Sequence, residues 1–201
     1  MHTAKSDTSD EYVHELLNSF MVTGRYSTIL ERQIAFALWQ RIANVHVICN
    51  EIGAIEKHPL AKSSRTKRDE ALTGDLTGLR HKHLMDARFI AKNVFNHWAA
   101  RDEELVQLCA NVMADEAIPL DKKPGHIFHL VMASYEHRSR ARRLTGEWIV
   151  FARHQKRNYY LSLASHSEQT RDILLRCLEA SREFSELSQL VIELELGASS
   201  R

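Results

Sequence analysis

EWIVFARH (residues 147–154), QKR (155–157) and NYYLSLASH (158–166) form the stretch that decides the fold. Two runs rich in β-branched and aromatic residues flank a short polar connection, which predicts an antiparallel β-hairpin. The centre of each run is apolar at consecutive positions. We therefore expect helices to cover both faces of the hairpin.

The rest of the chain shows the apolar spacing of three and four residues that is typical of amphipathic helices. We expect six helices, at about 10–21, 28–57, 77–99, 102–113, 121–144 and 167–184. Residues 190–196 alternate apolar and acidic side chains, so they either extend the last helix or add a third strand. The predicted fold is mainly α, with about six helices and a small C-terminal antiparallel β-hairpin of two or three strands packed on them.

The predicted organisation is one compact unit, with a helical N-terminal layer (1–120) and a C-terminal layer of helix and hairpin (121–201). The chain has 201 residues, 27 Lys and Arg, and 26 Asp and Glu, so no net charge favours nucleic acid or membrane. The three cysteines are widely separated, and no signal peptide or apolar run of membrane-spanning length occurs. We expect a cytoplasmic protein without cofactor or membrane partner; its oligomeric state stays open.

Polar side chains at the hairpin ends suggest a catalytic set. A four-residue loop at 155–158 would place His154 opposite Tyr159, Arg153 opposite Tyr160, and Glu147 opposite His166. RNA cleavage at a 2′-hydroxyl needs a base, an acid and cations, all of which this set supplies. The candidate catalytic residues are Glu147, His166, His154, Arg153, Arg143 and Tyr160, with Arg142 beside them. An exposed salt bridge and a cation–π contact are the ordinary alternatives.

Histidines also gather on one face of the predicted helix at 121–144. His126, His129, His137 and Arg140 fall within a narrow arc opposite the apolar residues, so they line either solvent or a cleft. Two imidazoles three residues apart can share a metal, but the motif is weak and we expect no metal site. In the predicted helix at 77–99, Arg80 and His81 point outward and are further binding candidates, whereas His83 faces the core.

Three functional hypotheses follow. The first is a small protein that acts on or binds nucleic acid, as a metal-independent ribonuclease of toxin type would; whether catalysis occurs stays open. In residue types and layout this set is similar to small ribonuclease toxins of the barnase and RelE type, whose diagnostic motifs are not found here. The second is a non-catalytic helical module that binds another protein chain, and the third a metal-dependent enzyme using the histidine faces. The loop at 60–78, with Lys62, Arg65, Lys67 and Arg68, is a further candidate contact for a polyanion.

Overall fold

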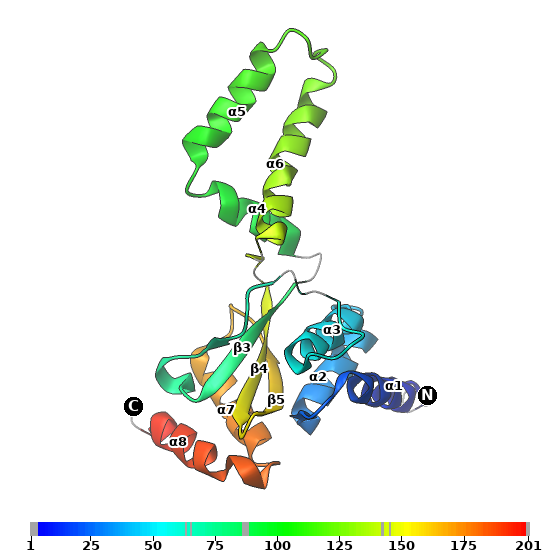
Figure 1. The fold of residues 1–201 in the computed structure, drawn as a ribbon, viewed down its shortest axis with the longest axis vertical. Coiled ribbons are helices and arrows are strands. Elements are labelled where there is room, and N and C mark those ends of the chain that lie inside the picture. Colours follow the sequence, from blue (N-terminus) through cyan, green and yellow to red (C-terminus); the bar gives the residue numbers. More distant parts are fainter. Residues whose placement is uncertain are drawn as a thin grey trace.

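The computed structural model describes residues 4–62, 64, 66–85, 89–141, 143–144 and 146–199, with side chains described between residues 10 and 196 (Figure 1). These residues form two parts. A body holds a β-sheet between two layers of helices, and an arm of three helices projects from one end of the body (Figure 1).

Five strands build the sheet, in the order β1-β5-β4-β3-β2. β1 pairs parallel with β5, and the other pairs are antiparallel. The prediction of a mainly α fold with a small C-terminal hairpin is therefore wrong, because strands from the whole chain join one mixed sheet. The strands are β1 (Arg25–Tyr26), β2 (Glu70–Ala71), β3 (Leu79–Leu84), β4 (Glu147–His154) and β5 (Arg157–Ala164).

The two faces of the sheet carry separate apolar cores. The first core packs side chains of α1, α2 and α3 against Leu84, Ile149, Phe151 and Tyr160. The second packs α7 and α8 against Leu79, Val150, Tyr159 and Leu161. The helices of the body are α1 (Ala4–Phe20), α2 (Thr28–Trp39), α3 (Val45–Glu56), α7 (Thr170–Ser181) and α8 (Ser188–Ser199), with 3₁₀ turns η1 (Gly74–Leu76) and η3 (Ser185–Leu187).

The arm connects β3 to β4. It consists of α4 (Ile90–Trp98), α5 (Asp102–Ala114) and α6 (Lys123–Arg140), and α5 and α6 extend away from the sheet (Figure 1). Its two ends lie close together, because Leu84 at the end of β3 pairs with Glu147 at the start of β4. None of the helices formed by the described residues combines the length and apolar composition needed to cross a lipid bilayer.

Two of the predicted helices are wrong, and the open alternative at residues 190–196 is decided in favour of a helix. The expected helix at 28–57 is interrupted: Arg41 adopts a positive φ of 54°, and the Asn44 side chain then caps α3 by accepting from the amide of His46. The expected helix at 77–99 is replaced by strand β3 followed by α4, because β3 is buried on both faces. Residues 190–196 belong to α8 and not to a third strand.

The hairpin itself is confirmed, but its register is wrong. The turn contains two residues, Gln155 and Lys156, with positive φ of 45° and 67°, as a tight hairpin turn with right-handed strand twist requires. Arg157 to Ala164 then pair with His154 back to Trp148, with an irregularity between Val150 and Phe151. Arg153 therefore faces Asn158 and not Tyr160 across the ladder.

Candidate functional site

Three histidines and a tryptophan meet at the end of the sheet nearest the arm. His81 and His83 lie two residues apart on β3, so their side chains share one face. Trp148 of β4 is the register partner of His83, and His166 follows the end of β5. These four residues are called the histidine cluster below.

The rings of the cluster are in mutual contact. The centroids of His81 and Trp148 are 4.7 Å apart, and those of Trp148 and His166 are 4.6 Å apart. His83 stacks on His166 at 5.5 Å with an interplanar angle of 24°, and its centroid is 5.1 Å from that of His81. His81 and His83 are buried, whereas His166 is exposed, so His166 forms the solvent side of the cluster.

Burial sets the protonation of these imidazoles. It lowers the pKa of His83 to about 4, and the positive charge of Lys67 acts in the same direction. Burial likewise lowers the pKa of His81 and of His166, and the charge of Lys92 on α4 further lowers that of His166. All three rings therefore favour the neutral form, in which one nitrogen has a free lone pair.

Polar atoms in the cluster are unsatisfied. Within the described part of the chain, Nδ1 of His81 and Nε1 of Trp148 are buried without a hydrogen-bond partner. Nδ1 of His83 lies 3.4 Å from the carbonyl oxygen of Gly146, which can only accept. Nδ1 of His83 is therefore assigned as the protonated nitrogen, which leaves Nε2 as an acceptor. Buried polar atoms without partners are uncommon, and a water molecule or a ligand can satisfy them.

Close packing of the backbone at Gly146 against Leu84 positions the carbonyl that contacts His83. A Cβ at Gly146 would lie 1.8 Å from the carbonyl oxygen of Leu84, so only glycine allows the two chain segments to approach this closely. This approach brings the Gly146 carbonyl to His83 at the start of β4. Strands β3 and β4 thus set the position of the Gly146 carbonyl relative to His83.

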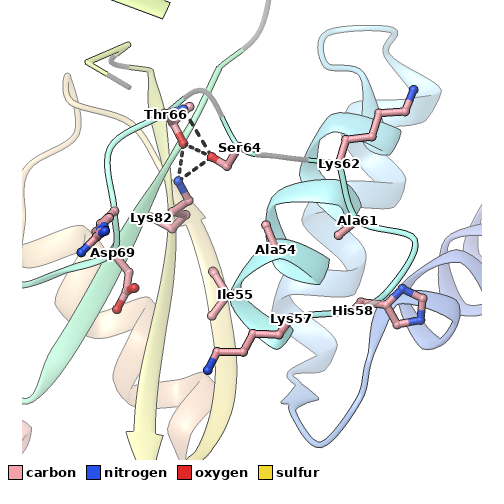
Figure 2. A pocket seen from close by; sticks show the side chains of 11 residues that line it. Ala54, Ile55, Lys57, His58, Ala61, Lys62, Ser64, Thr66, Asp69 and Lys82 are labelled. Atoms are coloured by element: carbon pink, nitrogen blue, oxygen red, sulfur yellow. Dashed lines mark hydrogen bonds between the residues drawn. The ribbon is translucent and has the colours of Figure 1, made fainter. Parts of the chain in front are cut away.

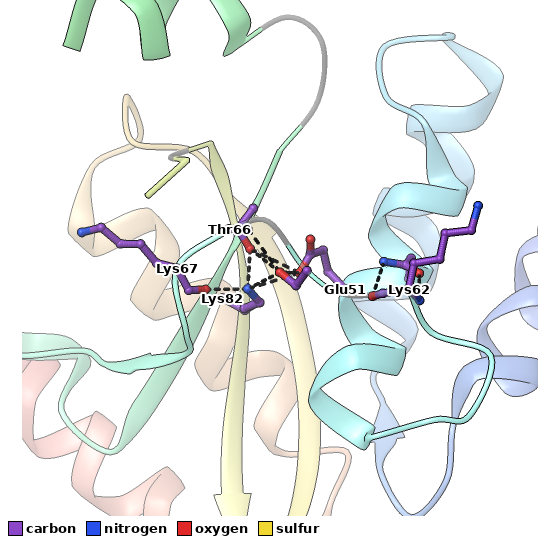
Figure 3. Close-up of polar contacts among 7 residues, drawn as sticks. Glu51, Lys62, Thr66, Lys67 and Lys82 are labelled. Carbon is purple, nitrogen blue, oxygen red and sulfur yellow. Dashed lines mark hydrogen bonds and ion pairs between the residues drawn. The ribbon is translucent and has the colours of Figure 1, made fainter. Parts of the chain in front are cut away.

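A charged network lies on the opposite face of β3. Lys82 is buried there, and its Nζ is 3.2 Å from Oε2 of Glu51 on α3 (Figure 3). The same ammonium donates to Oγ of Ser64 at 2.8 Å, to the hydroxyl of Thr66 and to the carbonyl of Lys67. These contacts hold Ser64, Thr66 and Lys67, which follow α3 in the chain, against the middle of β3.

The structure separates Glu147 from His166, although the sequence predicted them as a pair. Glu147 is opposite Leu84, whose side chain belongs to the core under α1 to α3. It lines a cavity of about 210 Å³ there, together with Gln33 and Glu168. His166 contacts Trp148, whose side chain lies on the other face of β4 from that of Glu147.

Other predicted catalytic residues have structural partners. Tyr160 is buried and donates to Oε1 of Glu56 at 2.7 Å; burial and this carboxylate raise its pKa above the ordinary value. Arg153 donates to Oδ1 of Asn158 at 2.8 Å and lies 3.4 Å from Asp69. His154 is half-buried beside the hairpin turn, opposite Arg157.

The remaining candidates are dispersed. Arg80 forms an ion pair with Asp69 at 2.7 Å, and Arg143 is exposed near the base of the arm. The α6 residues His126, His129, His137 and Arg140 are all exposed and do not face the hairpin. Arg65 and Arg142 lie outside the described residues.

The sequence analysis identified some residues of the histidine cluster but did not predict that they lie together. It selected His81 and His166 separately, assigned His83 to a helix core, and overlooked Trp148 as a site residue. If residues 79–84 are read as a strand, the two-residue period of its side chains puts His81 and His83 on one face, which would have predicted that they lie together.

Comparison of the chain with protein-family models, with curated proteins and with solved structures finds no match. Among the described residues, no group of three His, Cys, Asp or Glu side chains is arranged to hold a metal ion. The geometry of the site is therefore the basis for inferring a function.

Proposed function

We propose that this chain is a metal-independent ribonuclease that cleaves RNA at a 2′-hydroxyl, with the histidine cluster as its acid/base centre. One observation carries the proposal: three imidazoles from β3 and the loop after β5 converge on one indole. Perturbed titratable groups that gather at one place favour a catalytic role over an isolated buried histidine.

The chemistry needs two proton transfers. The base removes the proton from the 2′-hydroxyl, and the 2′-oxygen forms a bond to phosphorus. The bond from phosphorus to the 5′-oxygen breaks, and that oxygen leaves with a proton from the acid. Neutral His83 suits the base, because Nε2 is its acceptor. The exposed His166 serves as the acid in its protonated form, whose population rises as the pH falls, since burial and the nearby lysines lower its pKa. The products are a 2′,3′-cyclic phosphate and a 5′-hydroxyl.

Two lysines supply positive charge beside the cluster. The charge of Lys67 acts on all three imidazoles, and that of Lys92 acts on His166. Such cations stabilise the negative charge that develops on the phosphorane oxygens. Trp148 offers an aromatic surface on which an unstacked RNA base can lie. The cluster thus contains a base, an acid, cations and a stacking surface.

Cleavage of a fluorescent single-stranded RNA in EDTA tests the proposal. We expect wild-type protein to cleave it, and His166→Ala and His83→Ala to lose on the order of 10²-fold or more of kcat/KM. His126→Ala, in an exposed arm histidine, is the matched control and should retain the wild-type rate. Since His83 is buried, circular dichroism checks that its variant folds.

A substrate with a 2′-deoxy residue at the scissile position separates this mechanism from others. It should resist cleavage, because the attacking oxygen is missing. The proposal is overturned if wild-type protein leaves RNA intact, if it cleaves the 2′-deoxy strand equally well, or if folded His166→Ala keeps full activity.

The arm favours a second candidate function, binding of another protein chain. The arm exposes large apolar side chains: Phe95 of α4 is 69% accessible, Leu120 in the connection between α5 and α6 is 74% accessible, and Val106 and Phe128 are also exposed. Such surfaces are typical of protein interfaces. We propose a second copy of the chain as the occupant, which light scattering can test with the pure protein. A monomer at high concentration, or a dimer unchanged by Phe95→Ser/Phe128→Ser, would contradict this candidate.

A further inference from the structure

A pocket on the α3 side of β3 is lined by several cationic side chains. It encloses about 350 Å³ between the end of α3, the segment that follows it and β3 (Figure 2). Its charged and polar lining includes Lys57, Lys62, Ser64, Arg68, Asp69 and Lys82. The histidine cluster is on the opposite face of the same strand.

The charges of this pocket do not cancel. Buried Lys82 is paired with Glu51, and Asp69 is paired with Arg80 and Arg153. Within the part of the chain that the structure describes, none of the exposed side chains Lys57, Lys62 and Arg68 forms an ion pair with a carboxylate. The pocket therefore carries a net positive charge of about three, which favours an anion.

The buried network makes the pocket a defined structure. Ser64 and Thr66 form part of its lining and donate to Oε2 of Glu51 at 2.7 and 3.3 Å. Asn50 holds the amide of Lys62 at 2.8 Å. Lys62, Ser64 and Thr66 are thus held against α3 and β3 in the absence of a ligand. Such preorganisation lowers the entropic cost of binding a ligand.

The same segment also reaches the histidine cluster. Figure 3 shows the Lys62 and Lys67 side chains extending in opposite directions from the Glu51–Lys82 network. The charge of Lys67 acts on the imidazoles, whereas Lys62 lines the pocket. Among the described strands, β2 pairs with β3 only as far as His81, so this segment follows the open edge of β3 beside Lys82.

We propose that this pocket binds a phosphodiester group of the RNA strand whose 2′-hydroxyl reacts at the histidine cluster. This inference rests on the proposed ribonuclease function and adds a subsite to it. Lys57, Lys62 and Arg68 neutralise the phosphate at the surface of the pocket. The contact carries no base specificity, since phosphate contacts position a strand without reading its sequence.

Two measurements test the subsite. The first is titration of wild-type protein with inorganic phosphate by calorimetry, which should show saturable binding of one phosphate. Lys62→Gln/Arg68→Gln should weaken this binding about tenfold, because each lost cation removes part of the electrostatic attraction. Lys156→Gln/Arg157→Gln, with two exposed cations at the hairpin turn, is the matched control and should bind like wild type.

The second measurement compares substrates of two lengths. A dinucleoside monophosphate fills only the cluster, whereas a ten-nucleotide strand reaches both sites. The pocket variant should raise the KM of the ten-mer about tenfold at unchanged kcat, and it should leave the dinucleotide unaffected.

The outcomes separate this inference from the proposed function. Absence of saturable phosphate binding, or equal binding by the pocket variant, overturns the pocket as an anion site. Phosphate binding by a protein that cleaves no RNA overturns the ribonuclease function and the RNA subsite, but retains an anion site. An equal effect on both substrate lengths overturns the separate subsite.

Discussion

Replacing Lys82 by methionine should strongly destabilise the body of the protein. The substitution keeps the length and most of the volume of the side chain but removes the ammonium that is 3.2 Å from Oε2 of Glu51. Glu51 is only 5% accessible, so its charge would stay buried, and among the described residues the hydroxyls of Ser64 and Thr66 would still donate to it. Breaking a buried ion pair by removing one partner costs about 3–5 kcal/mol.

A double-mutant cycle measures this effect. Lys82→Met, Glu51→Gln and the double variant are compared in urea, with unfolding followed by tryptophan fluorescence and circular dichroism. We expect the double variant to be more stable than the sum of the single effects predicts, with a coupling energy of about 2 kcal/mol. For a chain of this length, a loss of 3–5 kcal/mol lowers Tm by roughly 6 to 20 °C.

Lys122→Met provides the matched control, because the pair that Lys122 forms with Asp121 at 3.3 Å is exposed. Removing it should change stability by less than about 0.5 kcal/mol. The reasoning would be refuted if Lys82→Met cost less than about 1 kcal/mol, or if the effects of the two single substitutions were additive.

Three further predictions concern stability. Gly24→Ala should cost about 1–3 kcal/mol in urea unfolding, since its Cβ would lie 2.7 Å from Oε1 of Glu56 and 2.9 Å from the Tyr160 ring; wild-type stability would show that this contact relaxes freely. Folded His83 has a pKa of about 4 against 6.5 when unfolded, so its contribution to stability is complete above pH 6.5 and falls by about 3 kcal/mol toward pH 4; His83→Gln should show a shallower decline, to which His81 and His166 still contribute, and an unchanged slope would exclude His83 as a cause. Lys156→Gly should raise stability by up to about 1 kcal/mol, because φ at this residue is 67°; a lower denaturation midpoint would contradict the turn geometry.

The hairpin was predictable from sequence because its two runs have strong β propensity and a polar connection. Its register was not predictable, since the turn residues Gln155 and Lys156 lack the Asn-Gly or Gly signature of a two-residue turn. The pairing differs from the expected one by two residues next to the turn and by one residue beyond the irregularity at Val150 and Phe151, which changed every expected cross-strand partner.

Strand β3 was missed for a different reason. Its sequence, LRHKHL, places a lysine and two histidines in the interior, where charged residues are rare without partners. The partner of Lys82 is Glu51, which is 31 positions earlier and shows no local relation to it. The histidine cluster was hidden by the same error, because a helix at 77–99 directs His81 and His83 to different sides.

The arm begins and ends at one place in the sheet, because Leu84 and Glu147 are register partners. In topological terms it is an insertion at the tip of a β-hairpin formed by β3 and β4. Forming that hairpin requires closure of a loop of 62 residues (85–146). A four-residue turn in its place would reduce the entropic cost of closure by roughly 2 kcal/mol. The body therefore bears an entropic cost of folding that a short turn between β3 and β4 would avoid.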